Sequence, residues 1–345
     1  MKKAGIVTLF GEYNFGNRLQ NYAVQEVLRK MELEVETIKY MPRNNNQPVI
    51  QNQIDENRLA KFKNFNEYIK FADEILYVDN EMLRSANKYD YIILGSDQIW
   101  NYHFEKFFSD KIFGSFVPKE KRISFSASFG INSIPKENEK LYCTYQKYLE
   151  DLKAISVREE VGKEIVESLT NRNDVEVLID PTMMLETLEW EKVMKKPQNL
   201  KTNKFILKSF LGNISGEIGE ELNRIAKEND CEIVDISNKD SEFYDVGPAE
   251  FIYLEKNAFL VVTDSFHSCV FSILFSTPFM IFERQDELAS MYSRIETLLE
   301  KFKLHHRIFN GKITQEVFSN DYSKAYEILQ SEREKVYKFL EKVNK

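Results

Sequence analysis

The chain contains few of the residues that build disulfide or metal scaffolds. Its 345 residues include only three cysteines, Cys143, Cys231 and Cys269, which lie far apart and form no CxxC pair. This spacing argues against a disulfide framework and against a zinc site, so we expect three buried thiols and no bound metal. The HExxH and GxSxG motifs of metalloproteases and serine hydrolases are also absent.

The sequence also lacks long apolar runs and an excess of positive charge. No stretch approaches the roughly 18 apolar residues that cross a bilayer, and Met1-Lys2-Lys3 leads directly into a strand-like segment without a signal pattern. The formal net charge is −8, with lysine and arginine spread among acidic residues, which removes the electrostatic case for nucleic acid. We therefore expect a cytoplasmic protein that does not bind nucleic acid.

What the chain does contain is an alternation of short apolar runs with helical patterns. With 43% hydrophobic and 30% charged residues it is typical of a globular protein, and its length accommodates two α/β domains. The alternation predicts parallel sheets covered by helices, one sheet in each half of the chain. The predicted strands are Gly5–Leu9, Val35–Ile38, Tyr91–Leu94, Ile123–Ser126, Ala154–Val157, Val175–Ile179, Phe205–Lys208, Glu232–Ile236, Phe259–Val262 and Phe279–Phe282.

The polar, lysine-rich segment Glu191–Lys204, which contains Pro197, predicts the boundary between the two domains. We therefore expect an N-terminal domain over residues 1–190, a C-terminal domain over 200–320 and a C-terminal helix over 321–345.

Two further segments have a recognisable character. Met41–Gln53 is rich in asparagine and glutamine and predicts an exposed loop or lid. Ser331–Lys345 predicts an amphipathic helix whose apolar stripe docks either on its own protein or on a membrane surface. The stripe consists of Val336, Phe339, Leu340 and Val343.

Polar residues follow several of the predicted strands in the first half of the chain. Gly11 and Gly16 do not form the GxGxxG fingerprint of dinucleotide sites, and Asn14 and Asn17 are candidate caps of the next helix. Open α/β sheets bind ligands at the carboxyl ends of their strands. The same position is occupied by Ser96 and Asp97 after Tyr91–Leu94, and by the alternating serines at 124, 126 and 128, although ordinary turns also contain such residues.

Arg158 and His267 are the most distinctive residues at strand ends. Arg158 directly follows an apolar strand, where its guanidinium could pair with a carboxylate or phosphate of a ligand or form an interdomain salt bridge. His267 lies beside Ser265 and Ser268 at the predicted start of a helix, which is a ready site for an anion. A bound anion would favour the protonated histidine, although the ring could instead merely cap the helix.

Six segments, in this order, resemble the polysaccharide pyruvyl transferase family: GEYNFGNRLQNYAVQ, YDYIILGSDQIW, ISFSASFG, ISVREE, LIDPT and TDSFHSCVFS. The resemblance implies an α/β fold of two Rossmann-like domains in a GT-B arrangement, with the active site in the interdomain cleft. It also implies phosphoenolpyruvate as donor, a saccharide as acceptor, a pyruvate ketal or acetal as product, and a role in cell-surface polysaccharide biosynthesis.

The resemblance implies roles for individual residues. His267 is similar to the family's catalytic histidine, and Arg158 to its arginine for the anionic donor. Some members have an arginine where this chain has Ser265, so we expect Arg284 or Lys208 to supply the missing charge. Ser265 and Ser268 are expected at the donor phosphate, and the residues expected to face the acceptor are Asn14, Asn17, Gln20, Ser96 and Asp97.

We expect no cofactor beyond phosphoenolpyruvate as donor substrate. The saccharide acceptor could be linked to undecaprenyl diphosphate, which implies peripheral contact with the inner face of the membrane. Two alternatives remain open: a GT-B glycosyltransferase that uses a nucleotide sugar, and a non-catalytic saccharide-binding relative.

Overall fold

The computed structural model describes residues 1–11, 13–42, 53–79, 83–212, 216–283, 292–318 and 321–344, without the side chains of 53, 54, 217, 343 and 344. These residues form two compact units. Unit 1 contains the described residues of Met1–Val49, Asn66–Met184 and Ser331–Lys345, and unit 2 those of Ile50–Phe65 and Leu185–Gln330.

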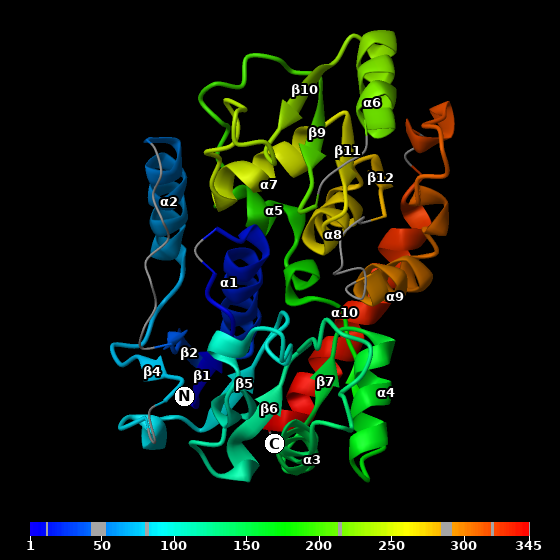
Figure 1. The fold of residues 1–345 in the computed structure, drawn as a ribbon. Coiled ribbons are helices and arrows are strands. Elements are labelled where there is room, and N and C mark those ends of the chain that lie inside the picture. The colour runs from blue at the N-terminus through cyan, green and yellow to red at the C-terminus, as the bar shows by residue number, and fades with distance from the viewer. Residues whose placement is uncertain are drawn as a thin grey trace. The chain divides into compact units, whose positions relative to one another are not determined.

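Unit 1 is built on a parallel sheet in the order β2-β1-β5-β6, with the two-stranded pairs β3-β4 and β7-β8 beside it (Figure 1). Single bridges from Ile123 to Ala154 and from Ala127 to Val157 join β6 to β7. The strands are β1 (Lys3–Val7), β2 (Glu34–Thr37), β3 (Tyr40–Met41), β4 (Leu76–Tyr77), β5 (Tyr91–Leu94), β6 (Arg122–Ser124), β7 (Ser156–Val157) and β8 (Glu176–Val177). The α-helices of this unit are α1 (Phe15–Lys30), α3 (Glu139–Glu150) and α4 (Glu160–Leu169).

The central strands β1 and β5 are buried except at Lys3, as expected for a parallel sheet with helices on both faces. All four residues of β5 are buried, which explains its continuous apolar sequence. The helix that follows β1 starts where Asn14 caps it, by accepting a hydrogen bond from the Asn17 backbone N–H at 3.1 Å.

Unit 2 contains a second parallel sheet, in the order β10-β9-β11-β12 (Figure 1). Its strands are β9 (Phe205–Ser209), β10 (Glu232–Asp235), β11 (Leu260–Thr263) and β12 (Phe279–Ile281). Its helices are α2 (Gln53–Phe65), α5 (Thr187–Glu191), α6 (Gly216–Asn229), α7 (Pro248–Asn257), α8 (Phe266–Phe275) and α9 (Ser293–Phe302). The last helix, α10 (Ser323–Asn344), begins among the residues of unit 2 and ends among those of unit 1.

Each of the predicted strands is present, with ends that differ by a few residues. The pair β3-β4 was not predicted, and Met41 of β3 is the first residue of the segment that the sequence predicts as a loop. Most of the expected loop Met41–Gln53 lies outside the described residues.

The boundary between the two units lies earlier in the sequence than the expected start of the C-terminal domain. Unit 2 begins at Leu185 and not within Glu191–Lys204. The reason is the packing of α5: Trp190 is fully buried, with its ring 5.0 Å from that of Phe271 in α8. Burying a residue of this size stabilises the attachment of α5 to the second unit.

Helix α2 also belongs to unit 2, although it lies early in the sequence. Arg58 Nη1 donates a hydrogen bond to the Tyr244 carbonyl at 2.6 Å, and Lys61 Nζ lies 3.2 Å from Asp245 and 3.1 Å from Glu250. Pairings between residues so far apart in the chain leave no local signal in the sequence.

The C-terminal residues of α10 pack onto unit 1 and do not form a separate part. Val336, Phe339 and Leu340 of the predicted apolar stripe are 0%, 3% and 3% exposed, so the stripe docks on its own protein; the side chain of Val343 lies outside the described residues. Arg333 Nε donates to the Met183 carbonyl at 2.8 Å. Among the described residues, no helix is both long and apolar enough to cross a membrane.

The expectation of three buried thiols is correct only for Cys269. Cys231 is half-buried and Cys143 is exposed. The buried stripe of α3 contains Leu141, Tyr145 and Leu149, four residues apart, and this spacing places Cys143 on the opposite side of the helix.

Gly130 is a position where a side chain does not fit. Its φ is +62°, and an added Cβ would lie 2.0 Å from Gln98 Oε1. We expect Gly130→Ala to lower the free energy of unfolding by roughly 1 to 3 kcal/mol, because the new side chain adds both backbone strain and a clash.

The matched control is Gly219→Ala in α6, where an added Cβ meets no described atom within 4 Å. It is expected to be neutral or to stabilise by up to about 1 kcal/mol, since alanine is the better helix former. Urea unfolding of both variants measures their free energies of unfolding. Equal values for Gly130→Ala and Gly219→Ala would contradict the conclusion that a side chain does not fit at position 130.

Candidate active site

The turn between β11 and α8, residues Thr263–Phe266, is tied to the end of the neighbouring strand β9. The Asp264 carboxylate accepts hydrogen bonds from the backbone N–H groups of Leu211 and Gly212, at 2.7 and 2.9 Å. Thr263 Oγ1 donates to the Ser209 carbonyl at 2.6 Å. Because β9 and β11 are parallel neighbours, both segments lie at the carboxyl edge of the sheet of unit 2, and these bonds fix their shape.

His267 is the second residue of α8 and is 8% exposed. Its ring packs edge-on against Phe266, with 5.3 Å between the ring centroids. Ser265 occupies the cap position, and its side chain makes no capping hydrogen bond within the described part of the chain. The first N–H groups of a helix lack intrahelical acceptors, so this start of α8 has the character of an anion site.

The Ser268 side chain, which was expected to contact the donor phosphate, instead makes its hydrogen bonds inside unit 2. It is fully buried, and its hydroxyl donates to Glu255 of α7 and lies 3.0 Å from Ser209 Oγ. Ser272, one turn further along α8, donates to the other Glu255 oxygen at 3.4 Å. Burial raises the pKa of Glu255 from 4.5 to about 8, despite these hydrogen bonds, which oppose the rise. The Ser268 hydroxyl therefore links α8 to α7, and only its backbone N–H belongs to the helix start.

The structure does not show Lys208 or Arg284, the two residues expected to replace a missing donor arginine, beside His267. Lys208 Nζ lies 2.6 Å from Asp235 on the adjacent strand β10, so its charge is already paired, and Arg284 lies outside the described residues. Arg294, the second residue of α9, is a cation near the start of α8 that the sequence did not single out. Its side chain is buried, with Cζ 5.7 Å from the ring centroid of Phe266. It is far from His267 in sequence and belongs to no motif, so no local signal could have identified it.

Arg158 lies in unit 1 at the centre of a second polar cluster. Its Nη1 is 2.7 Å from Asp180 Oδ2, and its Nη2 is 3.1 Å from Asp97 Oδ1. Burial lowers the pKa of Arg158, but attraction to Asp180 and Asp97 outweighs burial and raises it. The Asp97 carboxylate also accepts a hydrogen bond from Asn17 Nδ2. We call these four residues, Asn17, Asp97, Arg158 and Asp180, the Arg158 network.

Both of these ion pairs lie within unit 1, so they are not an interdomain salt bridge. The role of Arg158 at the anionic donor stays a prediction. Asp180 belongs to the LIDPT segment, but its pairing across strands could not be read from the sequence.

The other predicted acceptor residues adjoin this network. Gln20 Nε2 donates to Thr8 Oγ1 at 2.9 Å, and Thr8 Oγ1 donates to the Ser96 carbonyl at 2.9 Å. Ser96 Oγ lies 3.4 Å from Asp180 Oδ2. Asn14 is exposed, whereas the other predicted acceptor residues are buried. The sequence thus identified residues that the structure brings together, but most of them are interior.

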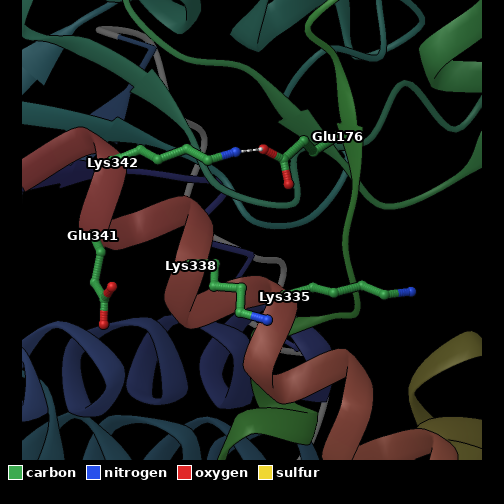
Figure 2. Close-up of a pocket in the computed structure, with 5 residues that line it drawn as sticks. All are labelled: Glu176, Lys335, Lys338, Glu341 and Lys342. Carbon is green, nitrogen blue, oxygen red and sulfur yellow. Dashed lines mark hydrogen bonds and ion pairs between the residues drawn. The ribbon is translucent and has the colours of Figure 1, made fainter.

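A surface pocket of about 340 Å³ lies elsewhere in unit 1, between α10 and β8 (Figure 2). It is lined by Glu176, Lys335, Lys338, Glu341 and Lys342. Lys342 points toward Glu176, with 3.0 Å between Nζ and Oε1 (Figure 2). Lys335 pairs with Glu332. Its lysines are matched by acidic partners, and no predicted site residue lines it, so it is not the candidate active site.

Glu255 makes the stability of the protein depend on pH. Unfolded glutamate ionises near pH 4, whereas the buried Glu255 keeps its proton to about pH 8. Folding thus takes up a proton between these values, and the stability that the neutral carboxyl provides is lost as the pH rises through this window. We expect the free energy of unfolding of Glu255→Gln, which stays neutral, to rise relative to that of the wild type by at most about 1.4 kcal/mol per pH unit from pH 5 to 8.

Urea unfolding of both proteins at several pH values measures this difference. Glu250→Gln, on the same helix but at the half-buried contact with Lys61, is the control. A stability difference between Glu255→Gln and the wild type that does not change with pH would show that Glu255 is not held neutral.

Comparisons with known proteins agree with this architecture. The sequence model of the family described as polysaccharide pyruvyl transferase matches residues 14–286. A search of curated proteins found no match. Similar solved structures include the UDP-GlcNAc 2-epimerase of Methanocaldococcus jannaschii, at 13% identity and a TM-score of 0.52, with 96% of this chain and 92% of that chain covered.

Another is the UDP-GlcNAc 2-epimerase of Neisseria meningitidis bound to UDP-GlcNAc, at 11% identity and a TM-score of 0.51, with 97% of this chain and 94% of that chain covered. At this identity the likeness concerns the fold alone, and it confirms the predicted class of two Rossmann-like α/β domains, as in GT-B proteins. Since the family model covers most of the sequence, the chain belongs to the polysaccharide pyruvyl transferase family.

Proposed function

We propose that this protein transfers the pyruvyl group of phosphoenolpyruvate to a saccharide and forms a pyruvate ketal during cell-surface polysaccharide biosynthesis. Family membership supports the reaction class. The observation that carries the assignment of the donor is His267 at the start of α8, where a histidine and a helix N-terminus occupy the carboxyl end of β11. An acid and an anion site are the two components that this donor needs.

The proposed reaction proceeds through C2 of phosphoenolpyruvate. Transfer of a proton to C3 converts the methylene into a methyl group and leaves C2 electron-poor. One saccharide hydroxyl attacks C2, phosphate leaves with its bridging oxygen, and a second hydroxyl attacks to close the ketal. The two hydroxyl protons balance the one gained at C3 and the one that leaves on phosphate.

In this proposal His267 supplies the C3 proton as general acid and regains one from an attacking hydroxyl. The start of α8 binds the phosphate, because backbone N–H groups and the helix dipole favour an anion at this end. The Asp264 hydrogen bonds to the Leu211 and Gly212 amides keep the neighbouring loop rigid, which keeps the site preorganised.

The acceptor is proposed to be a neutral saccharide that binds at the loops of unit 1 containing Asn14 and Gln98. Asn14 is exposed and Gln98 is half-buried, so both can reach hydroxyl groups of a ligand. A saccharide carried on a membrane-anchored diphosphate lipid fits polysaccharide assembly. Sedimentation of the protein with vesicles that contain such a lipid tests this part of the proposal, and absence from the pellet counts against it.

The donor is tested by calorimetric titration of phosphoenolpyruvate and, separately, of UDP-GlcNAc into the purified protein. Binding of phosphoenolpyruvate alone supports the pyruvyltransferase. Binding of UDP-GlcNAc alone would replace this proposal with a glycosyltransferase. Saccharide binding with neither donor bound would indicate a non-catalytic relative.

We expect His267→Ala to reduce kcat at least about 100-fold, because loss of a general acid typically costs 10² to 10⁴ in rate. Phosphate release from phosphoenolpyruvate in the presence of acceptor measures the effect. The control is His305→Ala, whose side chain is exposed, and it should keep the wild-type rate. If His267→Ala retained more than about a tenth of the activity, His267 could not be the acid.

We expect Arg294→Gln to raise the KM for phosphoenolpyruvate roughly tenfold or more, since a hydrogen bond to a charged group typically contributes 1.5 to 3 kcal/mol. This buried guanidinium is the described cation in contact with Phe266, next to His267. Arg224→Gln is the control, because Arg224 pairs with Glu221 and Glu228 on the surface of α6. An unchanged KM in Arg294→Gln would exclude Arg294 from the donor site.

A further inference from the structure

Glu255 of α7 is a buried ionisable residue of unit 2 that the proposed reaction does not use. Its side chain is fully buried. Moving a carboxyl out of water costs stability, and hydrogen bonds offset only part of that cost. An apolar side chain at this position would avoid it, so the retention of a carboxyl indicates a role in holding the elements around it.

The hydrogen bonds of Glu255 hold helix α8 near both of its ends. The carboxyl accepts hydrogen bonds from the hydroxyls of Ser268 and Ser272, the latter at 3.4 Å. Residues four apart lie on one face of a helix, so these two bonds fix how α8 is rotated against α7. Thr277, just after α8, donates from Oγ1 to the Glu255 carbonyl at 2.9 Å. A single residue of α7 therefore fixes the position of α8.

Ser268 connects Glu255 to the proposed donor site. It is the third residue of α8, so its backbone N–H is one of the first N–H groups, which lack intrahelical acceptors. Its hydroxyl also lies 3.0 Å from Ser209 Oγ at the end of β9, and the Ser209 carbonyl accepts the hydrogen bond from Thr263. The carboxyl is thus separated by one residue from the amides that are proposed to bind the phosphate.

The surroundings of Glu255 disfavour a negative charge. Burial raises the pKa of Glu255 to about 8. In α8, burial and then the charges of Glu255 and Asp264 raise the pKa of the Cys269 thiol. Other ionisable groups on the surrounding elements are His267, Arg294, Lys61 with Glu250, Lys256 with Glu191, and Tyr322. An ionised carboxyl would draw water into the contact between α7 and α8, and its charge would lie close to the bound anion.

We propose that Glu255 is a positioning residue for the donor: its uncharged carboxyl, acting through Ser268, holds the first turn of α8 in the shape that binds phosphoenolpyruvate. Loss of the proton releases this turn and weakens donor binding. The inference rests on the proposed function and adds to it a residue that touches neither substrate.

The size of the effect follows from the fraction of the protein in which Glu255 keeps its proton. If only this fraction binds the donor tightly, the apparent Kd is the intrinsic Kd divided by the fraction. A pKa of about 8 leaves Glu255 mostly protonated at pH 7 and mostly ionised at pH 9, so the apparent Kd rises roughly tenfold between these values. Phosphoenolpyruvate itself changes little in charge over this range, because the second pKa of a phosphate monoester is about 6.

The test is calorimetric titration of phosphoenolpyruvate at pH 7 and pH 9 into the wild type, Glu255→Gln and Glu250→Gln. Glu255→Gln keeps the size of the side chain and an acceptor for Ser268 but cannot ionise. Glu250→Gln makes the same change on the same helix, at the half-buried contact with Lys61, and is the control. Any titration of His267 affects all three proteins and cancels in the ratio of their Kd values.

We expect the ratio of the wild-type Kd to that of Glu255→Gln to be near one at pH 7 and about ten at pH 9, with Glu250→Gln following the wild type. A ratio that is the same at both pH values would overturn the inference. Failure of the wild type to bind phosphoenolpyruvate at either pH would contradict the proposed function instead. Amide hydrogen exchange of the wild type then decides the positioning role without a ligand or a variant.

The exchange measurement compares one amide of α8 with one of β11. The Cys269 amide donates to the Ser265 carbonyl at 3.1 Å and closes the first turn of α8, whereas the Val261 amide donates to the Pro278 carbonyl at 2.8 Å. We expect the protection of the Cys269 amide to fall between pH 7 and pH 9, with that of Val261 retained. Equal loss at both amides would indicate general destabilisation, and no loss at Cys269 would show that the turn does not respond to Glu255; either outcome overturns the inference.

Discussion

Parallel strand pairing is the constraint on which the rest of this structure depends. In each unit the strands run in one direction, so all their carboxyl ends lie along one edge of the sheet. Residues distant in sequence are thereby brought together: Asp97, Arg158 and Asp180 in unit 1, and Ser209, Thr263 and Ser268 in unit 2. Helices begin directly after these strand ends, so the same edge also carries helix N-termini.

Buried ionisable groups are stabilised differently at the two sheet edges. In unit 1, carboxylates surround one guanidinium, and serine and threonine hydroxyls fill the remaining acceptor positions. In unit 2, burial holds the carboxyl of Glu255 neutral, although two serine hydroxyls of α8 donate hydrogen bonds to it. Unpaired buried polar groups are costly, and in both arrangements hydrogen bonds within the unit reduce that cost. The contrast matters for function, because one edge is rich in carboxylates and the other presents a helix start beside a histidine.

Much of the fold and part of the site could be predicted from the sequence. Apolar runs such as Tyr91–Leu94 identify buried parallel strands, and polar residues directly after them identify the edge where ligands bind. The partners of these residues could not be predicted, since the pairing of Arg158 with Asp180 and of Ser268 with Glu255 depends on strand order and helix packing. For the same reason the sequence did not indicate that Arg294 lies near Phe266, or that the described residues of Ile50–Phe65, within the predicted domain 1–190, pack in unit 2.

Binding of the donor at the start of α8 is tested by amide hydrogen exchange with and without phosphoenolpyruvate. The first amides of a helix lack intrahelical acceptors, so their exchange responds to an anion that accepts their hydrogen bonds. The account predicts slower exchange at Phe266–Ser268 when phosphoenolpyruvate is bound, with Gly95–Gln98 unchanged. Protection at Gly95–Gln98 with none at the start of α8 would contradict it.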